Sequence, residues 1–205
     1  MDETKGHWEQ IYLTKSPSEL SWTQERPSPS LDWILEAVPN RSSAVIDVGG
    51  GISTLVDHLL LEGYDWPAVL DVSESALEIA RERLGSFAAQ VEWISADVTD
   101  CDFKRKYELW HDRAVFHFLT VRSDRVAYLA GLRKALVAGG KALLATFSPQ
   151  GPSKCSGLDV VRFDEKVLSL ELGEDFRLLR HERREHTTPW GTTQDFQYCL
   201  FQLEK

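Results

Sequence analysis

Three consecutive glycines follow a short apolar segment in residues 45–55, which read VIDVGGGISTL. Glycine loses more conformational freedom on folding than other residues, but it lets a ligand approach the backbone closely. In this stretch Gly49 can make a tight turn, Gly51 can admit a ligand, and Ser53 can begin a helix. The pattern favours a loop that binds a nucleotide-like cofactor, although a simple strand-to-helix turn would use the same glycines.

Two carboxylates follow where further strands would end. Asp71 stands about 20 residues after the glycines, as expected for an acid that accepts hydrogen bonds from ribose hydroxyls. Its alternative role is to cap the next helix, although Ser73 also offers a cap. Asp97, followed by Val98, suits an adenine amino group and the face of its ring, but aspartate is also common in turns. Together the two acids strengthen the prediction of a nucleotide site.

The segments that carry these residues alternate between two hydrophobic periodicities. Buried strands are predicted at 44–48, 67–72, 91–98, 107–115 and 141–147. Helices are predicted at 53–63, 73–85, 122–140 and 163–173. This alternation implies a parallel sheet, in which ligands bind beyond the carboxyl ends of the strands. Two strand-like segments, 176–188 and 193–204, meet at Pro189 and Gly191 and predict a terminal antiparallel hairpin.

Residues 1–43 are interpreted as an N-terminal helical extension, or lid, ahead of a single domain at 44–205. Helical spacing at 7–14 and 30–38 flanks a Ser- and Pro-rich loop, and Ser30 is a candidate cap. The side chains expected to cover a bound cofactor are Trp8, Tyr12, Trp22 and Gln24. A second lid is expected at 148–157, and 186–198 suits either a substrate-pocket wall or ordinary cross-strand pairs.

The series Asp47-x-Gly49-x-Gly51, then Asp71, then Ala96-Asp97-Val98, resembles the class I S-adenosylmethionine-dependent methyltransferases of the small bacterial type. The resemblance covers residues 44–205 and departs from the family at Ser53, where a third glycine is frequent. It implies an α/β fold with a Rossmann-like, doubly wound, seven-stranded sheet, mostly parallel with an antiparallel C-terminal hairpin. It also implies S-adenosyl-L-methionine as the cofactor, and with it methyl transfer.

In that family the glycine loop lies against the methionine part of the cofactor. The acid after the second strand holds the ribose, and the acid after the third strand meets the adenine. The residues that the resemblance assigns to cofactor binding are Asp47, Gly49, Gly50, Gly51, Asp71, Val72, Ala96, Asp97, Val98, Asp112, Arg113 and Trp22.

Residues 109–119, LWHDRAVFHFL, resemble the fourth motif of the family and imply that Asp112 and Arg113 lie beside the transferable methyl group. A sulfonium carries its own leaving group, so the enzyme mainly has to align the acceptor and exclude water. A base is needed only for a protonated acceptor, and the candidates are His111, Asp112 and His117. His117 equally suits helix packing, and Arg113 equally suits an acidic substrate or an internal ion pair.

Composition limits the partners. A net charge of −9 argues against nucleic acid as a general partner. Neither a signal-peptide pattern nor an apolar run of membrane-spanning length is present, so we expect a cytoplasmic protein without a membrane partner. Cys101, Cys155 and Cys199 are too far apart for a disulfide framework or a zinc ribbon, and no metal is expected. The sequence leaves open a small molecule or a protein side chain as acceptor, and a monomer or a homodimer.

Two other functions share parts of this pattern. An NAD(P)-dependent oxidoreductase also uses a glycine turn and an acid, but its G-x-G-x-x-G motif would need a glycine at Thr54. The short-chain branch needs a lysine four residues after a tyrosine, and this chain has no such pair. A non-catalytic S-adenosylmethionine-binding protein would keep the fold and the acids without turnover.

Overall fold

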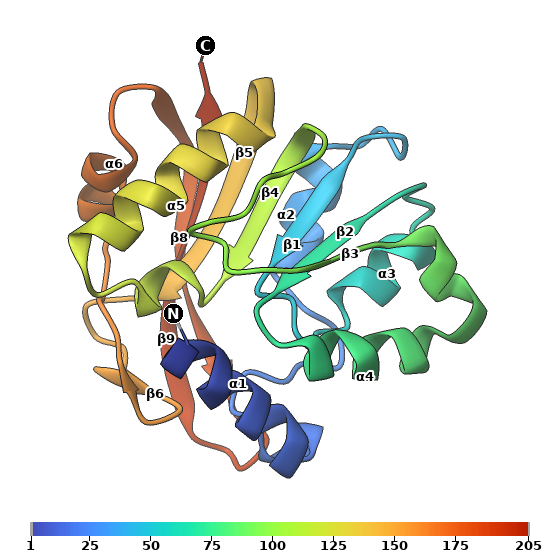
Figure 1. Ribbon diagram of the computed structural model, residues 1–205. Coiled ribbons are helices and arrows are strands. Elements are labelled where there is room, and N and C mark those ends of the chain that lie inside the picture. The colour runs from blue at the N-terminus through green and yellow to red at the C-terminus, as the bar shows by residue number, and fades with distance from the viewer. Residues whose placement is uncertain (1, 205) are drawn as a thin grey trace.

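A twisted seven-stranded sheet forms the centre of the molecule in the computed structural model, which describes residues 2–204 (Figure 1). The strand order is β3-β2-β1-β4-β5-β9-β8. The parallel strands are β1 (Val45–Val48), β2 (Ala68–Asp71), β3 (Glu92–Ser95), β4 (Tyr107–Arg113) and β5 (Leu136–Phe147). β9 (Thr193–Leu203) runs antiparallel to both β5 and β8 (Phe176–Thr187). The predicted sheet and its terminal hairpin are therefore confirmed.

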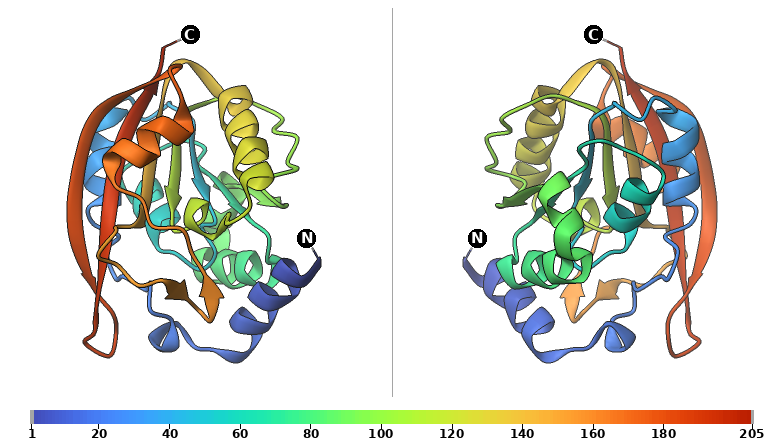
Figure 2. Two further views of the ribbon diagram at one scale, coloured as in Figure 1. Left: turned by 90° about the vertical axis from the view of Figure 1, so that its left-hand side faces the viewer. Right: turned by 90° about the vertical axis from the view of Figure 1, so that its right-hand side faces the viewer.

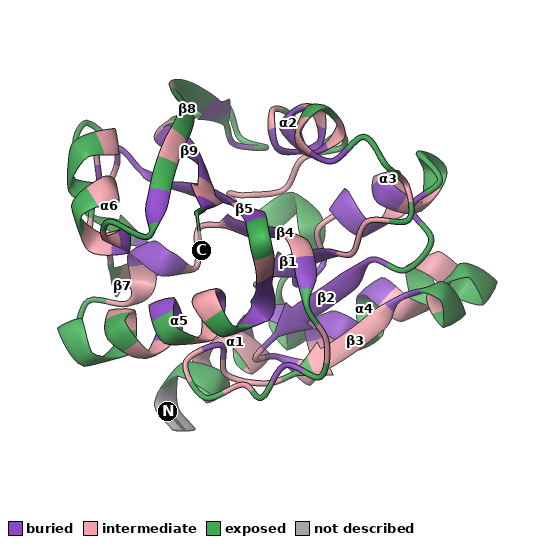
Figure 3. Ribbon diagram, turned by 90° about the horizontal axis from the view of Figure 1, so that it is seen from above, coloured by how far each residue is buried: buried purple, intermediate pink, exposed green. Residues whose placement is uncertain are grey.

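Helices cover both faces of this sheet, as the view from above shows (Figure 3). One face packs against α5 (Arg122–Ala135) and α6 (Glu165–Leu172). The opposite face packs against α2 (Ser30–Ala37), α3 (Leu55–Leu61) and α4 (Glu74–Leu84). Consecutive strand residues point to opposite faces, so each strand contributes to both layers of the core. The described residues include no helix long and apolar enough to cross a membrane.

Short 3₁₀ helices and a small hairpin complete the structure around the sheet. The 3₁₀ helices are η1 (Pro17–Glu19), η2 (Gly85–Gln90) and η3 (Phe116–Phe118). The hairpin pairs β6 (Lys154–Cys155) with β7 (Leu158–Asp159). The first strand of this hairpin lies within the segment 148–157, which the sequence predicts to be a lid, and the second strand lies just after it.

The predicted helix caps have different outcomes. Ser73 caps α4, because its hydroxyl accepts a hydrogen bond from the backbone N–H of Ala76 at 3.2 Å. Ser30 does not cap α2, and that prediction is wrong. Pro29 occupies the cap position, while the hydroxyl of Ser30 lies 2.8 Å from Nε2 of His111. A short polar side chain just before an apolar segment suits either role, and only the tertiary structure decides between them.

The helix expected at 122–140 ends earlier than the sequence indicated. α5 stops at Ala135, and Leu136 adopts an extended conformation and pairs with Tyr107 on β4. Gly139 then takes a positive φ of 75°, which allows the chain to bend within β5. Apolar residues at 136 and 137 satisfy helix and strand patterns equally, which explains the error.

The N-terminal extension lies beside α4, and α1 (Asp2–Thr14) approaches the N-terminus of that helix (Figure 2). The carboxylate of Glu9 accepts hydrogen bonds from the backbone N–H groups of Glu74 and Ser75, at 2.8 and 3.3 Å. A carboxylate at this position satisfies otherwise unpaired amides and interacts favourably with the helix dipole. Contacts of Ile11 and Tyr12 with Ile52 add an apolar attachment.

Candidate functional site

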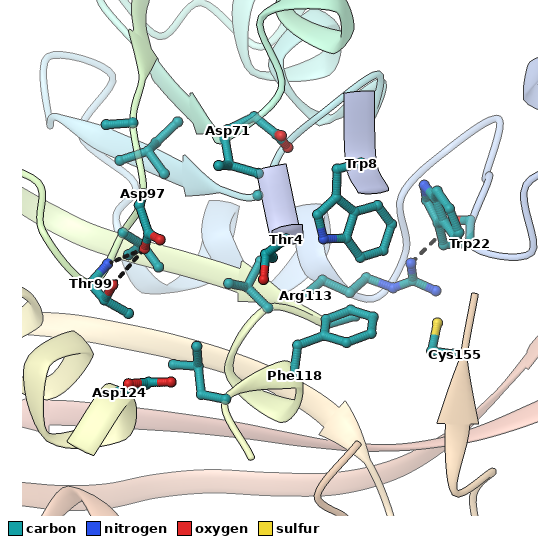
Figure 4. A pocket seen from close by; sticks show the side chains of 18 of the residues that line it. Thr4, Trp8, Trp22, Asp71, Asp97, Thr99, Arg113, Phe118, Asp124 and Cys155 are labelled. Carbon is teal, nitrogen blue, oxygen red and sulfur yellow. Dashed lines mark hydrogen bonds between the residues drawn. The ribbon is translucent and has the colours of Figure 1, made fainter. Parts of the chain in front are cut away.

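A cavity of about 460 Å³ lies where β1, β2, β3 and β4 end (Figure 4). Its volume is within the range of small-ligand sites, roughly 300–1,000 Å³. On the sheet side its wall includes Gly49, Asp71 and Asp97, and on the opposite side Trp8 and Trp22. Val72, Ala96 and Val98 also line it. The structure thus brings residues that are distant in sequence to one site, at the edge that the strand order predicted.

The glycine turn presents bare backbone to this region. Gly49 and Gly51 have φ values of 66° and 50°, in the left-handed region that favours glycine. A Cβ at Gly49 would collide with Val115, and one at Gly51 would collide with the hydroxyl of Tyr12. Gly50 faces a second, smaller cavity of about 170 Å³ on the other side of the turn. No side chain could be added at Gly51 without filling the space beside Asp71.

Asp71 ends β2 as a buried carboxyl without a cationic partner among residues 4–204. Burial raises its pKa to about 7, although the backbone N–H groups of Ser73 and Gly51 oppose this rise and Asp47 adds to it. Ser73 donates to Oδ1 at 2.8 Å. A buried carboxyl with spare acceptor capacity in a cavity wall suits a ligand that donates hydroxyl groups, as a ribose does.

Asp97 forms a turn, one of the two roles that the sequence left open, and it also lines the cavity. Its Oδ1 accepts hydrogen bonds from the backbone N–H and the hydroxyl of Thr99, at 2.8 and 2.6 Å, which forms a turn. The side chain of Asp97 still lines the cavity (Figure 4), and the next residue, Val98, also lines it. The turn therefore fixes the orientation of an acceptor group toward the ligand space.

The three residues predicted as possible bases lie beneath the wall of the main cavity. His111 is buried between Asp47 and Ser30, with Nδ1 2.7 Å from Oδ1 of Asp47 and Nε2 2.8 Å from Oγ of Ser30. The three side chains link β1, β4 and α2 behind the glycine turn. His111 reaches only the smaller cavity. This position supports a role in fixing Asp47 rather than in proton transfer to an acceptor.

Asp112 and His117 are fully buried and line neither cavity. Asp112 accepts hydrogen bonds from the hydroxyl of Tyr128 at 2.5 Å and from the backbone N–H groups of Val115 and Phe116. Burial raises the pKa of Asp112 to about 6, although these hydrogen bonds oppose the rise. Burial, together with the charge of Arg113, lowers the pKa of His117 to about 3. The structure thus differs from the expectation that Asp112 contacts the ligand, because it faces α5 instead.

Arg113 is the charged side chain of β4 that does reach the ligand space, and it lines both cavities. Its Nε donates to the hydroxyl of Tyr198 and its Nη1 to the carbonyl of Trp22, both at 3.2 Å. The guanidinium stacks over the ring of Phe196, with 4.6 Å to the ring centre. No described carboxylate pairs with it, so the internal ion pair that the sequence allowed does not form.

The predicted lid segments contribute aromatic walls. Trp8 packs edge-on against Trp22 and Phe118, with ring centres 5.8 and 5.1 Å apart. Tyr12 also lines the main cavity, whereas Gln24 lines the smaller one. The second lid segment contributes Cys155, and the terminal hairpin contributes Gln194 and Phe196. Sequence reasoning missed Thr4, Asp124 and Phe147, which no motif marks.

Comparison with known proteins agrees with this geometry. A family model described as a methyltransferase domain matches residues 46–142, which include the glycine turn, Asp71 and Asp97. Over these residues the chain is therefore similar to methyltransferase domains. A curated relative, malonyl-[acyl-carrier protein] O-methyltransferase of Anoxybacillus flavithermus, is 26% identical over 116 residues. These residues are 56% of this chain, which spans only 42% of the length of that relative.

Two solved structures show the same methyltransferase fold. The N-methyltransferase NodS of Bradyrhizobium japonicum, in complex with S-adenosylhomocysteine, has a TM-score of 0.75 at 13% identity, covering 98% of this chain and 99% of its own. The 1,6-didemethyltoxoflavin N1-methyltransferase of Burkholderia thailandensis has a TM-score of 0.71 at 15% identity, covering 100% and 85%. At such identities the likeness concerns the fold of the class I methyltransferases, and the site has to be argued from its own residues.

Proposed function

We propose that this protein transfers the methyl group of S-adenosylmethionine to a nucleophilic atom of a small molecule. The observation that carries the proposal is one cavity wall in which the bare backbone of Gly49 adjoins the buried carboxyl of Asp71, while Gly51 lies between Asp71 and the hydroxyl of Tyr12. A nucleoside with a flexible tail matches such a wall, because the carboxylate accepts from its hydroxyls and the glycines leave room for the tail.

Each part of the cofactor has a candidate contact in the chain. Asp71 would accept hydrogen bonds from the ribose hydroxyls, and Asp97 would accept one from the adenine amino group. Val98 would pack on the adenine ring, with Val72 and Ala96 beside it, and the backbone of Gly49 and Gly51 would lie along the amino-acid tail. Asp47 contacts His111 behind this turn and lines the smaller cavity, where it would support the turn.

The residues of the cavity favour catalysis by positioning. The bound cofactor supplies an electrophilic methyl group on a sulfonium. The chain supplies an aromatic enclosure of Trp8, Trp22 and Phe118 that excludes water from the reacting atoms. Burial raises the pKa of the Cys155 thiol to about 11, so this group stays protonated near neutral pH and cannot accept a proton from the acceptor. The acceptor atom is therefore expected to be nucleophilic on arrival, without loss of a proton to the protein.

The alternatives are separated by ligand binding and turnover. S-adenosylhomocysteine is expected to raise the melting temperature of the protein, whereas NADH is expected to leave it unchanged. Stabilisation by NADH alone would contradict the proposal. Transfer of a radiolabelled methyl group from S-adenosylmethionine to the low-molecular-weight fraction of a cell extract tests turnover. Label that appears only on protein would contradict a small-molecule acceptor, and cofactor binding with no label on either fraction would indicate a non-catalytic binder.

A further inference from the structure

Arg113 is a cation at the cavity that forms no ion pair with any carboxylate of residues 4–204. Two of its nitrogens are satisfied by uncharged acceptors, the hydroxyl of Tyr198 and the carbonyl of Trp22. Nη2 is shielded from water and has no hydrogen-bond partner in the described part of the chain. Arginine stays charged in proteins, and a charge removed from water without a partner is destabilising. The missing partner is therefore expected to be part of a ligand.

The groups around Arg113 respond to this unneutralised charge. Burial lowers the pKa of His186, and the positive charge of Arg113 lowers it further. Burial also lowers the pKa of His117, and the positive charge of Arg113 lowers it further. Neither histidine can supply a negative charge. The main-cavity carboxylates of Asp71, Asp97 and Asp124 all lie more than 4.0 Å from the guanidinium, since no ion pair joins them. Arg113 is therefore a cation in the cavity lining that none of these three carboxyls pairs with.

Several aromatic side chains line the cavity together with Arg113, and the polar Gln194 also contributes. Phe118, Phe147 and Phe196 line it with the buried thiol of Cys155. The ring of Phe196 also supports the guanidinium from one side. A planar guanidinium held in this way presents its remaining N–H groups to a carboxylate in a fixed geometry. We propose, on the basis of the methyltransferase function above, that Arg113 binds a carboxylate of the methyl acceptor, whose aromatic or aliphatic body packs among these rings.

The carboxylate of the cofactor is the other possible source of the same chemistry, because Arg113 also lines the smaller cavity beside the glycine turn. The contacts of the side chain favour the acceptor. Tyr198 and Phe196 belong to β9, which lies beyond β5 in the sheet order, whereas Asp71 lies on β2, on the opposite side of β4. These contacts thus hold Arg113 on the β5 and β9 side of β4, whereas the proposed nucleoside contacts lie on the β1 and β2 side.

The first arm of the test concerns the cofactor. Arg113→Met and the control Arg177→Met, which removes an exposed charge on β8, are titrated calorimetrically with S-adenosylhomocysteine and with 5′-methylthioadenosine, which lacks the amino-acid tail. Both variants are expected to bind both ligands within about threefold of the wild type. If Arg113→Met weakens S-adenosylhomocysteine about 30-fold but leaves 5′-methylthioadenosine unchanged, Arg113 binds the cofactor tail and the proposal is overturned.

The second arm concerns the acceptor and uses 3-phenylpropanoate with its uncharged analogue, 3-phenylpropanamide. Both probes are titrated into protein saturated with S-adenosylhomocysteine. The wild type and Arg177→Met are expected to bind the carboxylate about 30-fold more tightly than the amide, and Arg113→Met is expected to lose this preference. Equal binding of the two probes by the wild type would overturn the proposal. If S-adenosylhomocysteine does not bind, that failure counts against the proposed methyltransferase function. The two probes can then still be titrated into the free protein, which tests the carboxylate preference by itself.

Discussion

The two halves of the cavity are built in different ways. The half formed by β1, β2 and β3 uses backbone and short side chains at or just after the end of a strand, as Gly49, Asp71 and Asp97 are. The half beside β4, β5 and β9 uses large side chains from separate segments, such as Trp22, Cys155 and Phe196. Under the proposed function, the first half would bind the cofactor and the second half would bind the methyl acceptor. Variation between related enzymes is therefore expected to concentrate in the second half.

The largest expected effect comes from filling the first half. Gly51→Ala would place a methyl group against Tyr12 and near Asp71, so S-adenosylhomocysteine affinity should fall by about 100-fold or more. Gly63→Ala is the matched control, because Gly63 has a similar positive φ but open space around it. Each substitution costs about 1–3 kcal/mol of stability through backbone strain. Calorimetric titration of both variants checks the prediction, and equal affinities would remove the proposed role of the turn.

The second prediction concerns the first half of the cavity and the dependence of protein stability on pH. The pKa of Asp71 in the folded protein, about 7, is above its ordinary value of 3.8. Between these values the folded protein holds a proton that the unfolded chain has released, so this carboxyl makes the free protein less stable as pH rises through the window. Denaturant titrations across that range should show the decline in the wild type and its reduction in Asp71→Asn.

Ligand binding should change in the opposite direction at the same residue. Ribose hydroxyls donate to the ionised carboxylate, so affinity for 5′-methylthioadenosine should increase from about pH 6 to pH 8. In Asp71→Asn the affinity should be lower by roughly 10–100-fold and should no longer show this increase. An unchanged pH profile in that variant would mean that a group other than Asp71 titrates with binding.

The difference between the halves also explains how far sequence reasoning reached. Gly51, Asp71 and Asp97 follow strands directly, so hydrophobic runs located them without any knowledge of distant contacts. Phe196 could not be placed, because the pairing of β9 with β5 decides whether it faces the cavity, and a shift of one residue would reverse it.

Strand geometry also accounts for the candidate bases. His111 and Asp112 are neighbours on β4 and so point to opposite faces of the sheet, toward Ser30 and Tyr128 respectively. The polar atoms of both side chains are therefore engaged in buried hydrogen bonds. Arg113, the last residue of the strand, lies where the chain reaches the edge of the sheet. Residues of this motif line the cavity, but the sequence did not show which of its polar side chains would do so.

The smallest expected effect concerns the attachment of the lid to the first half. Burial alone would raise the pKa of Glu9, but hydrogen bonds from Ser75 and Glu74 outweigh it and lower that pKa. Glu9→Gln should destabilise the protein by about 0.5–1 kcal/mol and weaken S-adenosylhomocysteine binding by roughly twofold to fivefold. Glu19→Gln, in the exposed turn of the same extension, should leave the affinity unchanged. Equal effects of both substitutions would show that the contact with α4 does not stabilise the closed site.

The most direct test of the account is a crystal structure of the protein with S-adenosylhomocysteine. The account predicts that the ribose hydroxyls donate to the carboxylate of Asp71, that the adenine lies beside Asp97 and Val98, and that the amino-acid tail follows the backbone of Gly49 and Gly51. A nucleoside bound elsewhere, or Tyr12 still filling the space over Gly51 with the ligand displaced, would contradict it.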